Sequence, residues 1–191
     1  MRKLKLQVQL SVDGFMGGPA GEMDWLLFNW DEELKNYVTA LTSNMDCIVL
    51  GRKLAEGFIP YWTAVAANET DPQVAAGKLF ADTPKVVFTK TLERSPWNNT
   101  TVATNDLVDE IKQLKKQTGG DIMAYGGARF VASLIKHNLV DEYHLFINPS
   151  AIGTGLAPFN ECHPKRELNL VKATTFSCGI VVLHYTPKQA E

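Results

Sequence analysis

Ile122–Ile135 reads IMAYGGARFVASLI, and this stretch decides the fold. An apolar run leads into two adjacent glycines, Gly126 and Gly127, and then into residues with helical spacing. The pattern indicates a buried strand that turns directly into a helix. Glycine weakens both elements, so its presence at their junction needs a reason. Either the turn requires a backbone conformation that side chains resist, or bare N–H groups at the helix N-terminus bind a phosphate.

Two other predicted strands end in a similar way: Ile48–Leu54 reads IVLGRKL and Val86–Leu92 reads VVFTKTL. If all three strands run parallel in one sheet, their carboxyl ends meet at one edge, where open α/β sheets bind ligands. The basic residues of the two segments would add positive charge there. This inventory suits a ligand with several separated phosphates, such as a dinucleotide with a 2′-phosphate. The alternative is that these residues are surface cations beside ordinary strand–helix turns, and both interpretations stay open.

The rest of the chain alternates between strand and helix patterns. Period-2 alternation predicts a strand over Leu4–Val12, and helical spacing predicts helices over Asp31–Ser43 and Asn105–Gly120. Glu167–Pro187 looks like two strands joined near residue 178, a hairpin at the sheet edge. Helix breakers within Pro60–Pro84 predict a loop followed by a short helix from about residue 72. Together these elements predict an α/β fold with a mixed sheet.

The composition is typical of one globular domain. The chain has 191 residues, of which 45% are hydrophobic and 21% charged, and its net charge is −2. We therefore expect a single domain over residues 1–191 and no nucleic-acid partner. We find no signal-peptide pattern and no apolar stretch near the ~20 residues of a membrane span. Three widely spaced cysteines fit a reducing compartment, so we expect a cytoplasmic protein without membrane partners.

Common catalytic motifs are missing from the sequence. It contains no G-x-x-x-x-G-K-[ST], G-x-S-x-G, H-E-x-x-H, C-x-x-C or G-x-G-x-x-G. These absences argue against kinases, hydrolases, zinc proteases and standard Rossmann domains. The four histidines are His137, His144, His163 and His184. None stands beside another ligand type at metal spacing, so we expect structural roles for them and no metal site.

Six segments carry a resemblance to a known family: SVDGFMGG (11–18), MDW (23–25), IVLGRKL, KVVFTKTL, IMAYGGARF and DEYHLFINPSAIGTGLAPF (141–159). In order and approximate spacing they resemble the bacterial dihydrofolate-reductase-like family, which includes the reductase domain of riboflavin biosynthesis (the RibD C-terminal domain). The match covers nearly the whole chain. It implies a single dihydrofolate-reductase-like domain, with a mixed, mostly parallel central sheet flanked by helices and a C-terminal antiparallel hairpin. It also implies NADPH as the cofactor and a homodimer.

The same resemblance assigns cofactor-binding residues. IMAYGGARF is similar to the strand, turn and helix that hold the NADPH pyrophosphate, and LGRKL is similar to the segment at the 2′-phosphate. Leu54 stands where a threonine is usual, so that position offers its backbone N–H alone. The loop after the first strand is expected to cover the nicotinamide. The implied cofactor-binding residues are Gln9, Val12, Met16, Gly51, Arg52, Lys53, Leu54, Thr89, Lys90, Tyr125, Gly126, Gly127, Ala128, Arg129 and Phe130.

Substrate and catalytic residues are also implied by the resemblance. Trp25 and Phe15 are expected beside the substrate, and Asp13 and Glu32 are the candidate catalytic acids. Each acid has an ordinary alternative role. An Asp-Gly pair favours a tight turn at Asp13, and an acid in the first turn of a helix stabilises that helix at Glu32.

The sequence thus predicts an NADPH-dependent reductase that transfers a hydride to a small heterocyclic substrate of pterin or pyrimidine type. Dihydrofolate reductase and 5-amino-6-(5-phosphoribosylamino)uracil reductase are the two models for this reaction in the family. The alternative is a non-catalytic nucleotide-binding or sensor module on the same fold, because the sequence offers no unambiguous general acid.

Overall fold

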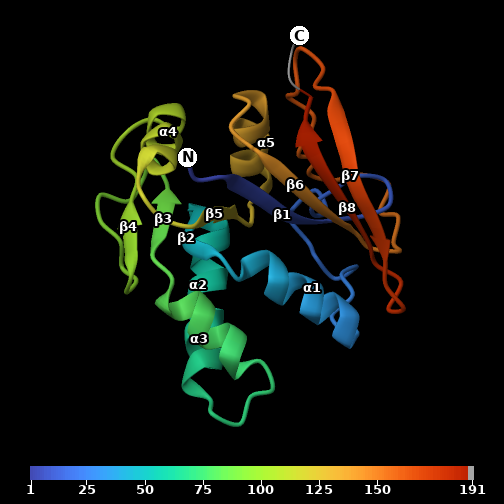
Figure 1. Cartoon of the computed structure of the whole chain (residues 1–191), viewed down its shortest axis with the longest axis horizontal. Helices are drawn as coiled ribbons and strands as arrows, with labels where there is room; N and C mark the ends of the chain where they lie inside the picture. The colour runs from blue at the N-terminus through green and yellow to red at the C-terminus, as the bar shows by residue number, and fades with distance from the viewer. Residues whose placement is uncertain (189–191) are drawn as a thin grey trace.

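A computed structural model describes residues 1–188, and its centre is a sheet of eight strands in the order β4-β3-β2-β5-β1-β6-β8-β7 (Figure 1). The strands are β1 Leu4–Leu10, β2 Met45–Gly51, β3 Lys85–Phe88, β4 Thr100–Val102, β5 Asp121–Ala124, β6 Glu142–Ile147, β7 Leu168–Thr175 and β8 Val181–Pro187. Neighbours from β4 through β6 are parallel, whereas β6–β8 and β8–β7 are antiparallel. The predicted mixed, mostly parallel sheet with a C-terminal hairpin is confirmed.

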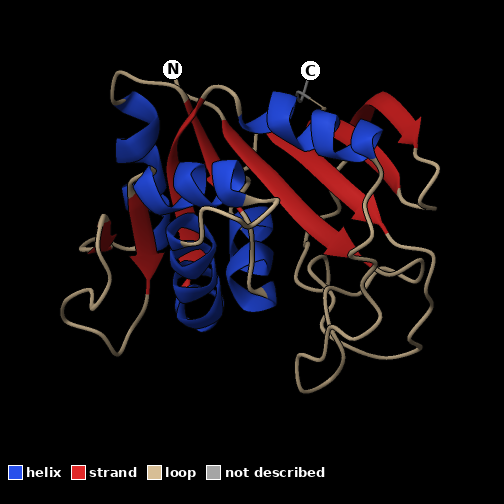
Figure 2. Cartoon of the chain, turned by 90° about the horizontal axis from the view of Figure 1, so that it is seen from below, coloured by secondary structure: helices blue, strands red, loops and turns tan. Residues whose placement is uncertain are grey.

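Helices cover both faces of the sheet (Figures 1 and 2). They are α1 Glu32–Thr42, α2 Arg52–Ala67, α3 Val74–Asp82, α4 Leu107–Lys116 and α5 Ala128–Lys136. One apolar core joins α4 and α5 to the face of β1 that carries Leu4, Leu6 and Val8, and a second core lies under α1, α2 and α3. Within residues 1–188, no helix combines the length and the apolar character needed to cross a membrane.

The predicted loop at the start of residues 60–84 is wrong, because α2 continues through Pro60. Proline removes one helical hydrogen bond, yet this helix is held by burial of Ile59 and by close packing on α3. A Cβ at Gly77 of α3 would lie 2.6 Å from the backbone nitrogen of Ala66, so only glycine allows the two helices to approach this closely. Tertiary packing therefore overrides the local signal of the proline. The short helix predicted after residue 72 is confirmed as α3.

Asp31 links the start of α1 to the turn between β7 and β8. Its carboxylate accepts hydrogen bonds from the backbone N–H of Leu34 at 2.8 Å, from the backbone N–H of Cys178 at 2.9 Å and from Ser177 Oγ at 2.8 Å. The Leu34 and Cys178 bonds are the main causes that lower the pKa of Asp31 to about 2. One short side chain therefore caps a helix and fixes the C-terminal hairpin against it.

This carboxylate makes stability depend on pH in a defined direction. The pKa of Asp31 is lower in the folded state than its ordinary value of 3.8, so its contribution is full above about pH 4 and is lost as the pH falls through 2. We expect Asp31→Asn to melt at a lower temperature than the wild type at neutral pH, and the gap to close as the pH approaches 2. Thermal melts over this range measure the gap, and a gap that stays constant with pH would contradict the assignment.

Candidate active site

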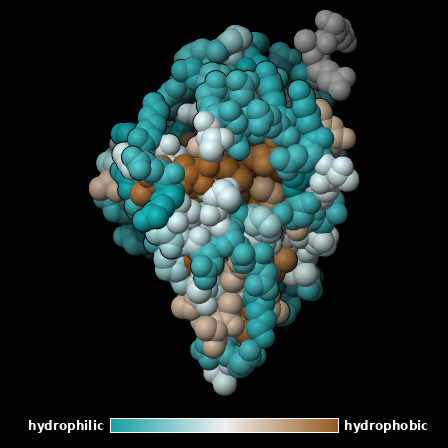
Figure 3. All heavy atoms as spheres, turned by 90° about the vertical axis from the view of Figure 1, so that its left-hand side faces the viewer, coloured by the Kyte–Doolittle hydropathy of each residue, from teal (hydrophilic) through white to brown (hydrophobic). Residues whose placement is uncertain are grey.

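A pocket of about 770 Å³ opens where β2, β3 and β5 end. Its volume is within the range of about 300–1,000 Å³ that is usual for small-molecule sites. The structure brings together here, from all three predicted strand ends, Gly51, Arg52, Lys53, Leu54, Thr89, Lys90, Gly127, Ala128, Arg129 and Phe130. Apolar walls come from Phe88 and Phe130, whose rings stack at 5.1 Å. A band of hydrophobic atoms also lies between hydrophilic ones on the face that carries β4 (Figure 3).

Two helices begin at this pocket without a side-chain cap. α2 begins after Gly51 and α5 after Gly127, and glycine has no side chain to accept a hydrogen bond from the first turn. By contrast, Asp31 caps α1 and Asp106 caps α4. The first N–H groups of α2 and α5 therefore lack side-chain partners, and both helix dipoles add positive potential. Such paired N-termini are suited to binding a phosphate or a pyrophosphate.

The glycines at the pocket serve different purposes. A Cβ at Gly51 would lie 2.9 Å from Phe130 Cβ, so glycine lets the start of α5 pack against the end of β2. Gly126 has a φ of +146°, a backbone conformation that side chains rarely adopt. Gly127 is unconstrained, because a Cβ there would meet nothing within 4 Å. Gly126 thus permits the turn, and Gly127 leaves space for a ligand to reach the N–H groups at the start of α5.

Basic side chains give the pocket a positive electrostatic potential. Its described lining holds four, Arg52, Lys53, Lys90 and Arg129, against one acid, Asp106, whose carboxylate already caps α4. On α2, Arg52 forms an ion pair with Glu56, one turn further along the helix. A bound anion would compete with Glu56 for this guanidinium. The charge balance favours a polyanionic ligand over a neutral or cationic one.

Five of the predicted cofactor-binding residues do not line this pocket. Gln9 Oε1 accepts a hydrogen bond from Asn148 at 2.8 Å, and the Met16 side chain packs beside Gly126. Val12 is exposed. The Tyr125 side chain faces the opposite core, where its ring stacks on Phe58 at 5.4 Å and burial raises its pKa. Only the backbone of Tyr125 adjoins the glycine turn. Cofactor binding by these five residues stays a prediction.

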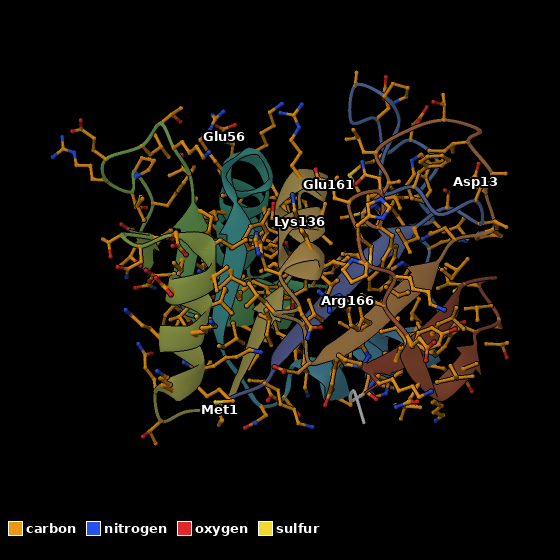
Figure 4. The ribbon with its side chains drawn as sticks, turned by 90° about the horizontal axis from the view of Figure 1, so that it is seen from above. Met1, Asp13, Glu56, Lys136, Glu161 and Arg166 are labelled. Carbon is orange, nitrogen blue, oxygen red and sulfur yellow. The ribbon has the colours of Figure 1, made fainter. Side chains whose placement is uncertain are left out.

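The two candidate acids also lie outside the lining of the pocket. The Asp13 carboxylate accepts hydrogen bonds from the backbone N–H groups of Gly153 at 2.6 Å and Ile152 at 3.1 Å, and so ties two loops together. In Figure 4, Asp13 lies among these loops, far across the molecule from Glu56 on α2. Glu32 pairs with Lys35 at the start of α1 and its side chain is 81% exposed. The tight turn at Asp13, closed by the Gly14 N–H on the Ser11 carbonyl at 3.0 Å, and the place of Glu32 in the first turn of α1 match the ordinary alternatives. The catalytic role of either acid stays a prediction.

The predicted substrate residues belong to the same group of loops. Trp25 Nε1 donates to the carbonyl of Glu22 at 3.2 Å, and the backbone N–H of Phe15 donates to Ser11 Oγ at 3.0 Å. The carbonyl of Trp25 accepts a hydrogen bond from Ser150 Oγ. This bond and the Val12 N–H bond to the Ser150 carbonyl at 2.8 Å connect the loops at 11–30 and 148–156. Contact of Trp25 or Phe15 with a substrate stays a prediction.

Several pocket residues were not predicted from the sequence. They include Pro19, Ala20, Asn105, Asp106 and Leu156, which come from the first loop, the segment at the start of α4 and the loop after β6. A signal existed for Asp106, because an acid directly before a helical pattern indicates an N-cap. The other contributions depend on how distant loops fold over the sheet edge, which local patterns do not encode.

The fold and the pocket define an α/β protein that presents two bare helix N-termini and a basic wall at the carboxyl edge of its parallel strands. The RibD C-terminal domain model matches residues 2–182, and the chain belongs to that family. A relative from Bacillus subtilis (strain 168), "Uncharacterized protein YyaP", is 32% identical over 186 residues, which cover 96% of this chain and 94% of the relative.

Solved structures give the same fold. A putative riboflavin biosynthesis protein from Shewanella sp. PV-4 matches with a TM-score of 0.71 and 20% identity over 99% of this chain and 100% of the other. Dihydrofolate reductase from Enterococcus faecalis, complexed with NADP(H) and RAB-propyl, matches with a TM-score of 0.64 and 15% identity over 98% and 97% of the two chains. The implied dihydrofolate-reductase-like fold is confirmed.

Proposed function

We propose that the chain is an NADPH-dependent reductase that transfers a hydride to a small heterocycle of pterin or pyrimidine type. One observation carries the proposal: the bare N-termini of α2 and α5 share a pocket with four basic side chains. This combination suits a dinucleotide with an additional phosphate better than it suits any ligand with a single charge. The NADP(H) complex of the Enterococcus faecalis dihydrofolate reductase supports the same cofactor.

Each part of the pocket has a task in this proposal. The N–H groups after Gly127 hold the pyrophosphate, while Arg52 and Lys53 at the start of α2 hold the 2′-phosphate. Met16 and the loop around it exclude water from the nicotinamide end, since Met16 already packs on Gly126. When bound, NADPH supplies the hydride, and the chain contributes binding and orientation.

A non-catalytic nucleotide-binding module is the second candidate, and one observation favours it. Asp13 and Glu32 are engaged in contacts outside the pocket lining, and Asp106, the acid within that lining, caps α4. If the chain is a reductase, these contacts leave water as the proton donor for its substrate. The two candidates differ in turnover and share the cofactor pocket.

Oxidation of NADPH in the presence of dihydropterin and aminopyrimidine acceptors tests the proposal. We expect the absorbance of the reduced nicotinamide to fall with at least one class of acceptor, and to stay constant in a variant that cannot bind the cofactor. Saturable binding of NADPH without oxidation by any acceptor in the panel would support the binding module instead.

A further inference from the structure

Three potential metal ligands meet on the sheet face beneath α1. Glu142 and His144 lie two residues apart on β6, so both side chains point to the same face, and His184 on β8 pairs with His144 across the antiparallel ladder. One carboxylate oxygen and one nitrogen of each imidazole lie within 4.8 Å of one another. None of the three residues lines the pocket described above. The cluster is therefore a separate place in the fold.

The two oxygens of the Glu142 carboxylate have different partners, and Oε2 faces the imidazoles in a long hydrogen bond with His144. Oε1 accepts a hydrogen bond from Lys3 Nζ at 2.7 Å. Oε2 lies 3.5 Å from His144 Nε2 and 3.7 Å from His184 Nε2. A tetrahedral ion with bonds of about 2.1 Å holds its ligand atoms about 3.4 Å apart. Both distances from Oε2 therefore match the spacing that such an ion needs.

The contacts of the two imidazoles also favour metal binding. Tyr37 on α1 holds His144 Nδ1 through its hydroxyl at 2.8 Å, which leaves Nε2 to face the carboxylate. Histidine ligands of metal sites usually have their second nitrogen held in this way. His184 Nε2 is buried and has no hydrogen-bond partner among the described residues. An unpartnered buried nitrogen that faces a carboxylate and a second imidazole is explained by an ion between them.

We propose that Glu142, His144 and His184 bind a divalent transition-metal ion, with Zn²⁺ as the species that fits best and water as the fourth ligand. Two imidazoles and a carboxylate are ordinary zinc ligands, and the site keeps one position open. The His184 side chain is 21% exposed, which gives the ion a route of entry. The two rings stack at 4.2 Å and have to turn toward each other to share the ion. Bound there, the ion joins β8 of the C-terminal hairpin to β6.

The ammonium group of Lys5 lies close enough to repel a bound ion, and this repulsion offers a further test of the metal site. Its Nζ lies 3.8 Å from Glu142 Oε2 and 2.8 Å from Asp121 Oδ2. A metal ion would displace this ammonium toward Asp121, and the two cations would repel each other. Because of this repulsion, removal of the charge by Lys5→Met should tighten zinc binding by roughly tenfold.

Calorimetric titration with ZnCl₂ tests the proposal on chelator-treated, full-length protein without NADPH. We expect one ion per chain in the wild type and loss of the binding heat in His184→Gln. His137→Gln is the matched control, since His137 is an exposed residue at the end of α5 and its variant should bind zinc like the wild type. Tyr37→Phe should weaken binding by about 10- to 100-fold. Melts without zinc verify that each variant is folded.

The cobalt complex gives an independent spectroscopic signature. Co²⁺ should develop visible absorption bands typical of a tetrahedral site in the wild type and in His137→Gln, and not in His184→Gln. Equal zinc affinity in the wild type and in His184→Gln, or no binding to the wild type, would overturn the assignment. The result is independent of the proposed reductase function, because the titration contains no NADPH and the pocket shares none of these ligands.

Discussion

Gly127→Asp should abolish the binding of NADPH and NADH alike and leave the cofactor-free protein as stable as the wild type. Gly127 lines the pocket and precedes α5, its φ of −58° suits any residue, and a Cβ there meets nothing within 4 Å. An aspartate at this position would cap α5 with its own carboxylate and repel the pyrophosphate. At the N-cap, aspartate and glycine differ by only a few tenths of a kcal/mol in helix stability. We therefore expect an affinity loss of at least about 100-fold with little change in melting temperature.

The control for this variant is Gly57→Asp. Gly57 lies exposed on α2, has no atom within 4 Å of an added Cβ and does not line the pocket, so the same change of residue leaves the phosphate site intact. Calorimetry with NADH, which has no 2′-phosphate for Lys53 to contact, should show wild-type affinity for Gly57→Asp. If Gly127→Asp also kept its affinity for NADPH within a few-fold, the N-terminus of α5 would not be the pyrophosphate site.

Arg52→Ala should weaken NADPH binding by one to two decades and leave NADH binding nearly unchanged. Arg52 starts α2 within the pocket, where its guanidinium can hold a 2′-phosphate, and NADH lacks that group. A charge-assisted contact of this kind contributes about 1.5–3 kcal/mol, which corresponds to the expected loss in affinity. The loss should shrink at high salt, because part of the attraction is screened.

Glu56→Gln serves as the matched control for Arg52. In the cofactor-free protein Glu56 pairs with Arg52, so its removal frees the guanidinium, and NADPH should bind at least as tightly as to the wild type. Fluorescence or calorimetric titrations at two salt concentrations measure all three proteins with both cofactors. An equal loss for NADPH and NADH in Arg52→Ala would show that this arginine does not contact the 2′-phosphate.

Local patterns were sufficient to predict most of the fold. Several elements are encoded by residues that are neighbours in the chain. Examples are the alternation over Leu4–Leu10, the acids that precede α1 and α4, and the apolar runs before Gly51 and Gly126. Pro60 was misread because its helix is held by contacts with α3, among them the approach at Gly77, and such contacts are not visible in the local sequence. The edge formed by three strand ends was predictable, since it follows from parallel pairing alone.

Side-chain direction and strand register account for what was missed. Tyr125 directly follows β5, and its ring enters the core on the side of Phe58. The position of Tyr125 beside the glycines in the sequence did not indicate this direction. The histidines illustrate register: His144 and His184 lie 40 positions apart in the chain and meet only because β6 and β8 pair at those residues. Ligand spacing along the sequence therefore predicted no metal site, whereas the sheet places Glu142 and both imidazoles within 4.8 Å.

The central claim is that the pocket at the ends of β2, β3 and β5 binds NADPH, and a thermal melt with and without the cofactor tests it most directly. A ligand that binds only the folded state at 100 times its Kd adds about 2.7 kcal/mol to stability, which is a rise of roughly 5–10 °C for a chain of this size. We predict a rise of this order with NADPH and a smaller one with the same concentration of NADH. An unchanged melting temperature at millimolar NADPH would contradict the account.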